Sequence, residues 1–298
     1  MTKFIINKCP VCGSNHFCPF LACTDFVVSG EKYDIKTCAD CGLKITFNIE
    51  DEENIGKYYK SDEYIPHSNK SSGLVNTIYH KVRSYMLRRK RKIVEKATSM
   101  EKGRILDVGT GTGYFPDEMK QHGWEVSGTE KSHDARNFAR TKFNIEIKKT
   151  EDLFNLQNQQ FHAITLWHVL EHVHKLNENM ATFYRLLKKN GILVVAVPNN
   201  NSFDAVHYKE FWAAYDVPRH IWHFTAKQMK LLGEKHGFSL KQIRSMPFDG
   251  FYVSILSEKY KKSKIPVIKG SLYGLTSWIV SLFKPLKSSS SIYIFSKS

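Results

Sequence analysis

From residue 103 onward, short apolar runs alternate with segments in which apolar residues recur every three or four positions. The runs predict buried strands and the helical spacing predicts amphipathic helices, an order typical of βαβ units. The expected strands are 104–108, 124–129, 145–149, 161–166, 191–197, 239–246 and 291–296. The expected helices between them include 113–122, 134–143, 176–189 and 226–236. We therefore expect an α/β fold built on a largely parallel sheet.

The first 102 residues have a different pattern. Residues 1–50 hold six cysteines, four of them in two Cys-x-x-Cys pairs, and short β-like runs, whereas residues 51–102 are basic and have helical spacing. The apolar positions 82, 86, 87, 93 and 94 define one face of an amphipathic helix, with cations over much of the rest. We predict a ribbon over 1–50, a helical basic linker or lid over 51–102, and an α/β domain over 103–298.

The sequences Cys9-Pro-Val-Cys12-Gly and Cys38-Ala-Asp-Cys41-Gly form two matching knuckles. Two such turns place four thiolates around one ion, which predicts a closed, structural zinc site, as in zinc ribbons. Redox motifs or disulfides are the alternatives, but twin knuckles in a chain with no secretion signal at its N-terminus disfavour both. We expect Cys18 and Cys23 to be thiols rather than ligands.

The segment Arg104-Ile-Leu-Asp-Val-Gly-Thr-Gly-Thr-Gly-Tyr-Phe115 predicts a strand that ends in a glycine turn and feeds a helix. Such a turn presents bare backbone and a positive helix end to a ligand. Glycines 109, 111 and 113 are spaced two and two, which disfavours dinucleotide binding, and no Gly-Lys-Ser/Thr sequence follows for a phosphate loop. The next predicted strand ends in Glu130, where a carboxylate can accept from both ribose hydroxyls.

An acidic residue two positions before alternating glycines resembles the first motif of class I S-adenosylmethionine-dependent methyltransferases. The resemblance implies a Rossmann-like seven-stranded sheet whose last strand is antiparallel, with S-adenosyl-L-methionine as the cofactor. Asp107 would then lie near the ammonium of the ligand. The cofactor-binding residues it implies are Asp107, Gly109, Thr110, Gly111, Gly113, Glu130, Lys131, Glu151, Asp152, Trp167 and His168.

Two further segments resemble a subgroup of that family, the ubiquinone-biosynthesis-like and glycan-cluster methyltransferases. One is Phe161-His-Ala-Ile-Thr-Leu-Trp-His-Val-Leu-Glu-His-Val173, and the other is Pro218-Arg-His-x-x-His-Phe-Thr225. The family opens the first segment with an aromatic-Asp pair, where this chain has His162. Glu171 and His172 could pair with each other or cap the cleft, and a structural pair is as well supported as a catalytic one.

His220 and His223 are the candidate acid–base residues, because imidazole titrates near neutrality. We favour His220 as the base; a structural role suits His223 equally well. A metal role for this pair is not expected, since no third ligand of suitable spacing is evident. Thr225 has the residue type and position of a helix N-cap.

The resemblance also implies an aromatic lid and an acceptor-shaping insert over about 248–290. The candidates for lid and pocket are Tyr58, Tyr59, Tyr64, His67 and Tyr252, and ordinary packing between domains is the alternative. Within the insert, a helix at 271–283 is apolar at 272, 275, 279 and 282, with lysines on both sides. It could lie on an anionic membrane surface, but we expect it to pack on its own domain.

The net charge of +15 suits a nucleic acid, an anionic lipid or a phosphorylated substrate. The sequence therefore predicts a cytoplasmic methyltransferase that modifies an oxygen or carbon of a small acceptor. A phosphorylated or lipid-linked acceptor would account for part of the positive charge. Sugars, nucleotide- or lipid-linked glycan intermediates and quinone-like rings are the acceptors considered. Methylation of ribosomal or transfer RNA, and cofactor binding without turnover, are the alternatives; peripheral membrane contact is a further one.

Overall fold

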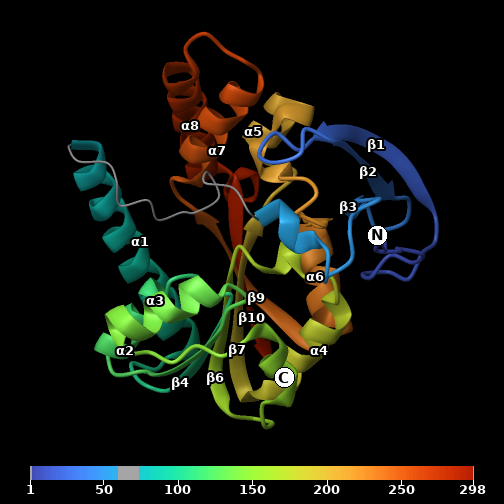
Figure 1. Cartoon of the computed structure of the whole chain (residues 1–298). Helices are drawn as coiled ribbons and strands as arrows, with labels where there is room; N and C mark the ends of the chain where they lie inside the picture. The colour runs from blue at the N-terminus through green and yellow to red at the C-terminus, as the bar shows by residue number, and fades with distance from the viewer. Residues whose placement is uncertain (1, 60–73, 298) are drawn as a thin grey trace.

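The computed structural model describes residues 2–59 and 74–297, and its centre is a mixed sheet in the order β5-β4-β6-β7-β10-β9 (Figure 1). Its strands are β4 (Arg104–Val108), β5 (Glu125–Thr129), β6 (Phe161–Trp167), β7 (Leu187–Pro198), β9 (Phe238–Met246) and β10 (Ser290–Lys297). β4 pairs in parallel with β5 and β6, and β6 with β7, whereas β10 runs antiparallel to both β7 and β9. The predicted α/β class and antiparallel last strand are confirmed.

Helices cover both faces of this sheet, with α1, α2 and α3 on one side and α4 and α6 on the other in Figure 1. The helices are α1 (Leu74–Thr98), α2 (Tyr114–Gln121), α3 (His133–Phe143), α4 (Leu176–Leu186), α5 (Phe203–Tyr208), α6 (Ala226–Lys235), α7 (Asp249–Tyr260) and α8 (Pro266–Phe283). Short 3-10 turns are η1 (Ile55–Tyr59), η2 (Thr150–Asn155), η3 (Leu170–His172), η4 (Lys209–Phe211), η5 (Ala213–Tyr215) and η6 (Pro285–Lys287). Thr225 is the N-cap of α6, as predicted.

The predicted strand 145–149 is wrong as a strand. It contributes a single parallel bridge, between Thr129 and Lys148, so the described sheet has six strands rather than seven. Ile145 and Ile147 are buried as the alternation requires, but they pack against Ala139 and Phe143 of α3 in a small separate cluster. The chain then turns into η2 before a ladder can form.

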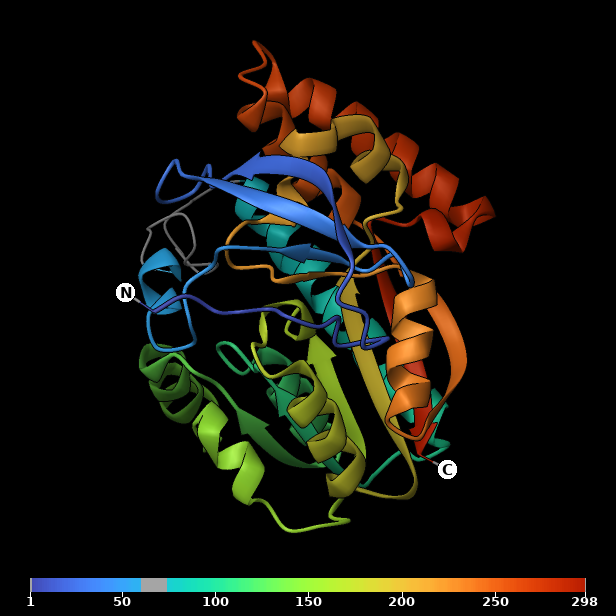
Figure 2. The same cartoon turned by 90° about the vertical axis from the view of Figure 1, so that its right-hand side faces the viewer.

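The N-terminal region forms a second, antiparallel sheet that continues into the α/β domain. Its order is β1-β2-β3-β8, from β1 (Phe17–Thr24), β2 (Lys32–Cys38), β3 (Lys44–Thr46) and β8 (Trp222–His223). The β3–β8 pairing joins segments far apart in the sequence, and Figure 2 shows the ribbon strands crossing above the main sheet. Ribbon and α/β domain therefore share backbone hydrogen bonds at this seam.

Candidate active site

The glycine turn lies between β4 and α2, at the carboxyl edge of the main sheet. The amide of Gly109 donates to the carbonyl of Thr129 at 2.8 Å, and the amide of Gly111 donates to Oε2 of Glu130 at 2.9 Å. The other oxygen of Glu130 accepts from the amide of Ser132 at 2.8 Å. The turn after the first strand and the carboxylate after the second are thus held together by direct bonds.

Two of the glycines explain why the motif requires this residue. At Gly109 the backbone is left-handed, with φ of +70°, and a Cβ atom there would lie 2.4 Å from Cγ2 of Val169. At Gly111 φ is +54°, yet a Cβ atom would meet nothing within 4 Å. Gly109 therefore packs against protein, whereas Gly111 faces open space, as a backbone that a ligand approaches closely must do. The turn fits S-adenosylmethionine.

Asp107 is the next-to-last residue of β4, just before the turn, and is buried. Its Oδ1 accepts from the hydroxyl of Thr165 on β6 at 2.6 Å. Burial raises the pKa of Asp107 to about 7, and the nearby Glu130 adds to the rise, while Thr165 and Lys90 oppose it. A carboxylate held in this way gains from a cation beside it, such as a ligand's ammonium. Sequence reasoning missed Thr165, although a polar residue inside an apolar strand was a usable signal.

The remaining predicted cofactor residues lie around this turn. Thr110 follows Gly109, and its amide also reaches the carbonyl of Thr129, at 3.1 Å. Lys131 donates to the carbonyl of Glu52 at 3.3 Å. Gly113 precedes α2 in a left-handed conformation, with φ of +83°.

Glu151 and Asp152 lie in η2, beyond the bridge that links Lys148 to Thr129. Glu151 is exposed, and Oδ2 of Asp152 accepts from the amide of Lys149 at 3.1 Å. A cavity of about 500 Å³ opens here; its lining is Arg136, Glu146, Ile147, Lys148, Lys149, Asp152, Asn155 and Leu156. Arg136 binds the carbonyls of Glu130 and Lys131. This cavity therefore borders the Glu130 end of the predicted cofactor site.

Trp167 ends β6 and His168 follows it, next to a half-buried lysine that the sequence did not single out. Nζ of Lys90, on α1, lies 4.6 Å above the Trp167 ring, and burial lowers the pKa of that amine. His168 lies between two carboxylates, with Nδ1 3.3 Å from Glu171 and Nε2 3.1 Å from Asp249. Burial alone would lower the pKa of His168, but these bonds outweigh it and raise the pKa to about 10. His168 is therefore a cation at neutral pH.

Lys90 and Asp249 were missed for different reasons. Lys90 is one of many cations in a basic run, and only the folded helix shows which of them points inward. Asp249 belongs to the insert, far along the chain from His168, so spacing could not connect the two.

Glu171, His172 and His220 form a buried cluster in which one ligand atom of each lies within 4.8 Å of the others. Nδ1 of His220 is 2.8 Å from the carbonyl of Ala214, and Nδ1 of His172 is 3.1 Å from the carbonyl of Arg219. Because a carbonyl only accepts, each Nδ1 carries the hydrogen and each Nε2 keeps its lone pair.

Part of the hydrogen-bonding capacity of this cluster is unused. Oε2 of Glu171 is buried and has no hydrogen-bond partner among the described residues. Burial, together with the nearby His220, lowers the pKa of His172 to about 4, so this ring is neutral at ordinary pH. These groups could accept a proton or hold a divalent cation. The cluster includes His220 but not His223, so it leaves the expectation of no metal role for the pair of His220 and His223 as a prediction. Glu171 bonds to His168 and not to His172. The sequence indicated a Glu171–His172 pair or a cap on the cleft, and neither alternative included His168.

His223 lies at the seam with the ribbon. Its Nε2 is 2.9 Å from the hydroxyl of Thr46 on β3, and that hydroxyl also donates to the carbonyl of His220 at 2.7 Å. Burial holds the pKa of His223 well below its usual value. These contacts suit a neutral ring that ties residues 218–225, which we call the histidine loop, to the ribbon.

The predicted lid residues do not lie together. The hydroxyl of Tyr59 lies 3.1 Å from Nδ1 of His172, beside the cluster. Tyr58 is buried against the ribbon, its hydroxyl 2.7 Å from that of Tyr33, and the Tyr252 side chain is 69% exposed on α7. Tyr64 and His67 lie outside the described residues.

The four knuckle cysteines converge, with their sulfur atoms within 4.8 Å of one another. The sulfurs of Cys9 and Cys41, and those of Cys12 and Cys38, are 3.5 Å apart. The glycine after each knuckle, Gly13 or Gly42, has φ of +81°. Thiolates about 2.3 Å from a tetrahedral ion are separated by similar distances, so this cluster fits zinc.

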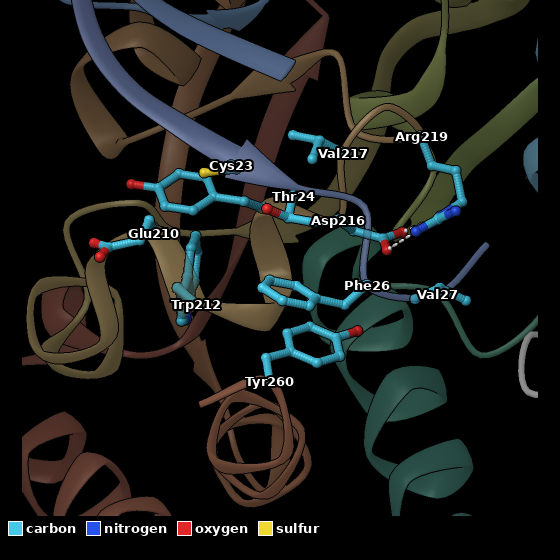
Figure 3. Close-up of a pocket in the computed structure, with 11 residues that line it drawn as sticks. Cys23, Thr24, Phe26, Val27, Glu210, Trp212, Asp216, Val217, Arg219 and Tyr260 are labelled. Carbon is cyan, nitrogen blue, oxygen red and sulfur yellow. Dashed lines mark hydrogen bonds and ion pairs between the residues drawn. The ribbon is translucent and has the colours of Figure 1, made fainter. Parts of the chain in front are cut away.

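A second hollow, between the ribbon and the insert, is too small for an acceptor. Figure 3 shows Phe26 of the ribbon and Tyr260 of α7 side by side beneath Asp216 and Arg219; the two rings stack at 4.4 Å. The cavity measures about 10 Å³, roughly the space of one water molecule. Arg219 instead bonds to Asp25 of the ribbon and to Asp216, and so fastens the histidine loop to the ribbon.

Comparison with known proteins agrees with the geometry. The model of the methyltransferase domain family matches residues 79–243, more than half of the chain. The ubiquinone biosynthesis O-methyltransferase of Pelagibacter ubique is 25% identical over 169 residues, 53% of this chain and 68% of that protein. Its namesake from Alkalilimnicola ehrlichii is 31% identical over 109 residues, covering 34% of this chain and only 44% of the relative.

Solved structures show the same fold. A SAM-dependent methyltransferase from Archaeoglobus fulgidus aligns with a TM-score of 0.51 and 21% identity, covering 72% of this chain and 94% of that one. Geranyl diphosphate C-methyltransferase from Streptomyces coelicolor A3(2), in complex with Mg²⁺, geranyl diphosphate and S-adenosyl-L-homocysteine, aligns at 0.52 with 12% identity, over 80% and 90%.

The chain therefore belongs to the methyltransferase domain family and has the class I methyltransferase fold. The predicted enzyme class is confirmed, and the family supports S-adenosylmethionine as its cofactor.

Proposed function

We propose that this protein transfers the methyl group of S-adenosylmethionine to an oxygen of a small molecule. The named O-methyltransferases among its relatives support oxygen over carbon. Sugars, glycan intermediates and quinone-like rings remain the acceptor classes of the proposal.

We also propose the three-part division at 1–50, 51–102 and 103–298, a cytoplasmic location, and zinc in the cysteine cluster. Among the described residues, no helix is long and apolar enough to cross a bilayer.

For the cofactor, we assign Asp107 and Glu130 to the ammonium and the ribose, with Gly109, Gly111 and Gly113 forming the turn around them. Bound S-adenosylmethionine supplies a methyl group made electrophilic by its sulfonium. Because this electrophile is already activated, the protein's task is to hold the acceptor in line and to remove its proton.

The observation that carries the proposal is the 2.8 Å contact between Nδ1 of His220 and the carbonyl of Ala214. The carbonyl of Ala214 fixes the hydrogen on Nδ1, so Nε2 can take the proton of an acceptor hydroxyl as its oxygen attacks the methyl group. The imidazolium that results has Asp216 beside it, with Oδ2 3.8 Å from Nε2, and Glu171 nearby. Both carboxylates stabilise that charge. His168 is already a cation, which leaves His220 as the better base.

An acceptor screen with methyl-labelled S-adenosylmethionine tests this proposal. The panel contains catechols and phenols, nucleotide sugars, a lipid extract and ribosomal RNA. We expect label in a small hydroxylated compound and none in RNA. Label in RNA would support the alternative suggested by the net charge of +15. Tight cofactor binding in calorimetry without transfer to any class would instead favour a binding protein without turnover.

A further inference from the structure

Helix α8 packs on α7 through its small residues. Gly270, Gly274, Ser277 and Ser281 are its buried positions. A Cβ atom at Gly270 would lie 2.3 Å from Cα of Ile255, and one at Gly274 would lie 2.6 Å from Cα of Phe251. The two backbones approach too closely for a large side chain between them. The prediction that this helix packs on its own domain is thus correct for the helix but wrong for its apolar residues.

The apolar residues of α8 lie on the opposite face and are exposed. Along the helix they are Ile268, Leu272, Leu275, Ile279 and Leu282, which are 67%, 63%, 41%, 43% and 58% exposed. Their spacing of four and three residues forms one continuous stripe. Phe283 and Leu286 extend it with exposures of 82% and 51%. We call these seven residues the α8 stripe; a contiguous apolar face of this kind marks an interaction site.

The chain on either side of the stripe carries positive charge alone. Residues 259–287 include seven lysines and no aspartate or glutamate. Lys261, Lys262 and Lys264 are exposed just before the helix, Lys269 is exposed one residue after the start of the stripe, and Lys284 is exposed at its end. A partner surface must therefore offer both apolar contact and negative charge.

We infer that the α8 stripe docks on the surface of an anionic lipid bilayer, with the helix lying in the plane of the interface. An anionic bilayer supplies acyl chains for the stripe and headgroup charge for the lysines. A second copy of this chain would place the same lysines against each other, which disfavours a dimer. No described helix can span a bilayer, so the contact is peripheral.

The docking face is connected to the active site through α7. Asp249, its first residue, binds His168 at 3.1 Å, and α8 packs along the same helix (Figures 1 and 2). Docking would therefore place α7, and with it Asp249, directly behind the helix that lies on the bilayer. The inference does not depend on the proposed acceptor, because vesicle binding is measured without turnover.

The test is flotation of the full chain with phosphatidylcholine vesicles that contain or lack phosphatidylglycerol. The wild-type chain should float with the anionic vesicles and stay behind with the neutral ones. The double change Leu272→Glu and Ile279→Glu should weaken binding at least about tenfold, because it puts charge into the apolar interface. The matched control is Ile5→Glu, at a residue 75% exposed on the ribbon, which should leave binding unchanged.

Two double variants that reverse lysine charges distinguish docking on anionic lipid from nonspecific hydrophobic adsorption. Lys262→Glu with Lys264→Glu should weaken binding to anionic vesicles about tenfold or more, whereas Lys227→Glu with Lys241→Glu, at exposed lysines on α6 and β9, should have a much smaller effect. Absence of flotation with anionic vesicles, or equal binding by the stripe variant, would overturn the inference. So would a dimer in sedimentation that the stripe variant abolishes, because a second copy would then occupy the stripe.

Discussion

The two ends of the candidate active site are built in different ways. The glycine turn comes from one strand–turn–helix unit plus Glu130, all within residues 104–130. The other end combines the Glu171–His172–His220 cluster with Tyr59 of η1 and with the His168–Asp249 pair, so it draws on residues from 59 to 249. The first end depends on local backbone geometry, whereas the second depends on tertiary contacts.

The two ends are also held in place by different parts of the molecule. The turn rests on the parallel sheet, where Gly109 bonds to Thr129 of β5. The histidine loop rests on the ribbon, because Thr46 of β3 holds the carbonyl of His220 and the ring of His223. The ribbon is therefore a scaffold for the histidine loop. This difference predicts that changes to each end should have separable effects.

The largest expected effect comes from His220→Asn. Loss of a general base should lower the rate of methyl transfer about 10²–10⁴-fold, while cofactor affinity stays unchanged. His223→Asn should instead lower the free energy of unfolding by about 1–3 kcal/mol, because a buried partner of Thr46 changes, with a smaller effect on the rate. Initial rates and thermal unfolding measured on both variants check this. Equal rate losses would assign the two histidines the same role.

A change at the ribbon should have the next largest effect. Cys38→Ser removes one of the four proposed zinc ligands, so amide-exchange protection of residues 221–223 should fall about a hundredfold or more, while residues 105–108 keep theirs. Calorimetry should find cofactor binding preserved. The control is Cys18→Ser, at an exposed thiol outside the cluster. Loss of cofactor binding in Cys38→Ser would show that the two ends are not separable.

The smallest effect concerns Asp107 and pH. Its pKa is raised to about 7 by burial, so the folded chain keeps a proton that the unfolded chain releases near pH 4. The contribution of this group to stability therefore falls as pH rises toward about 7 and is constant above it. Affinity for the cofactor, whose ammonium needs the carboxylate, should rise about tenfold per pH unit up to about pH 7. Calorimetry across this range should give a flat profile for Asp107→Asn; a flat profile for the wild-type chain would contradict the assignment.

The sequence was sufficient where neighbours along the chain set the geometry. It predicted the strand, glycine turn and helix at 104–121, the N-cap at Thr225, and two knuckles whose glycines have φ of +81°. It also predicted the α/β class from hydrophobic spacing. It erred at 145–149, because alternation of buried and exposed residues does not reveal whether a partner strand is within reach.

Tertiary structure decided everything that depends on residues distant in sequence. Only the fold shows that Lys90 points inward, that Asp249 makes a cation of His168, and that Tyr252 is exposed. Only the fold shows that α8 buries its glycines and serines and exposes its leucines and isoleucines. A helical pattern records which residues share a face, but the neighbour that packs most closely decides which face is buried, and here α7 requires the small one.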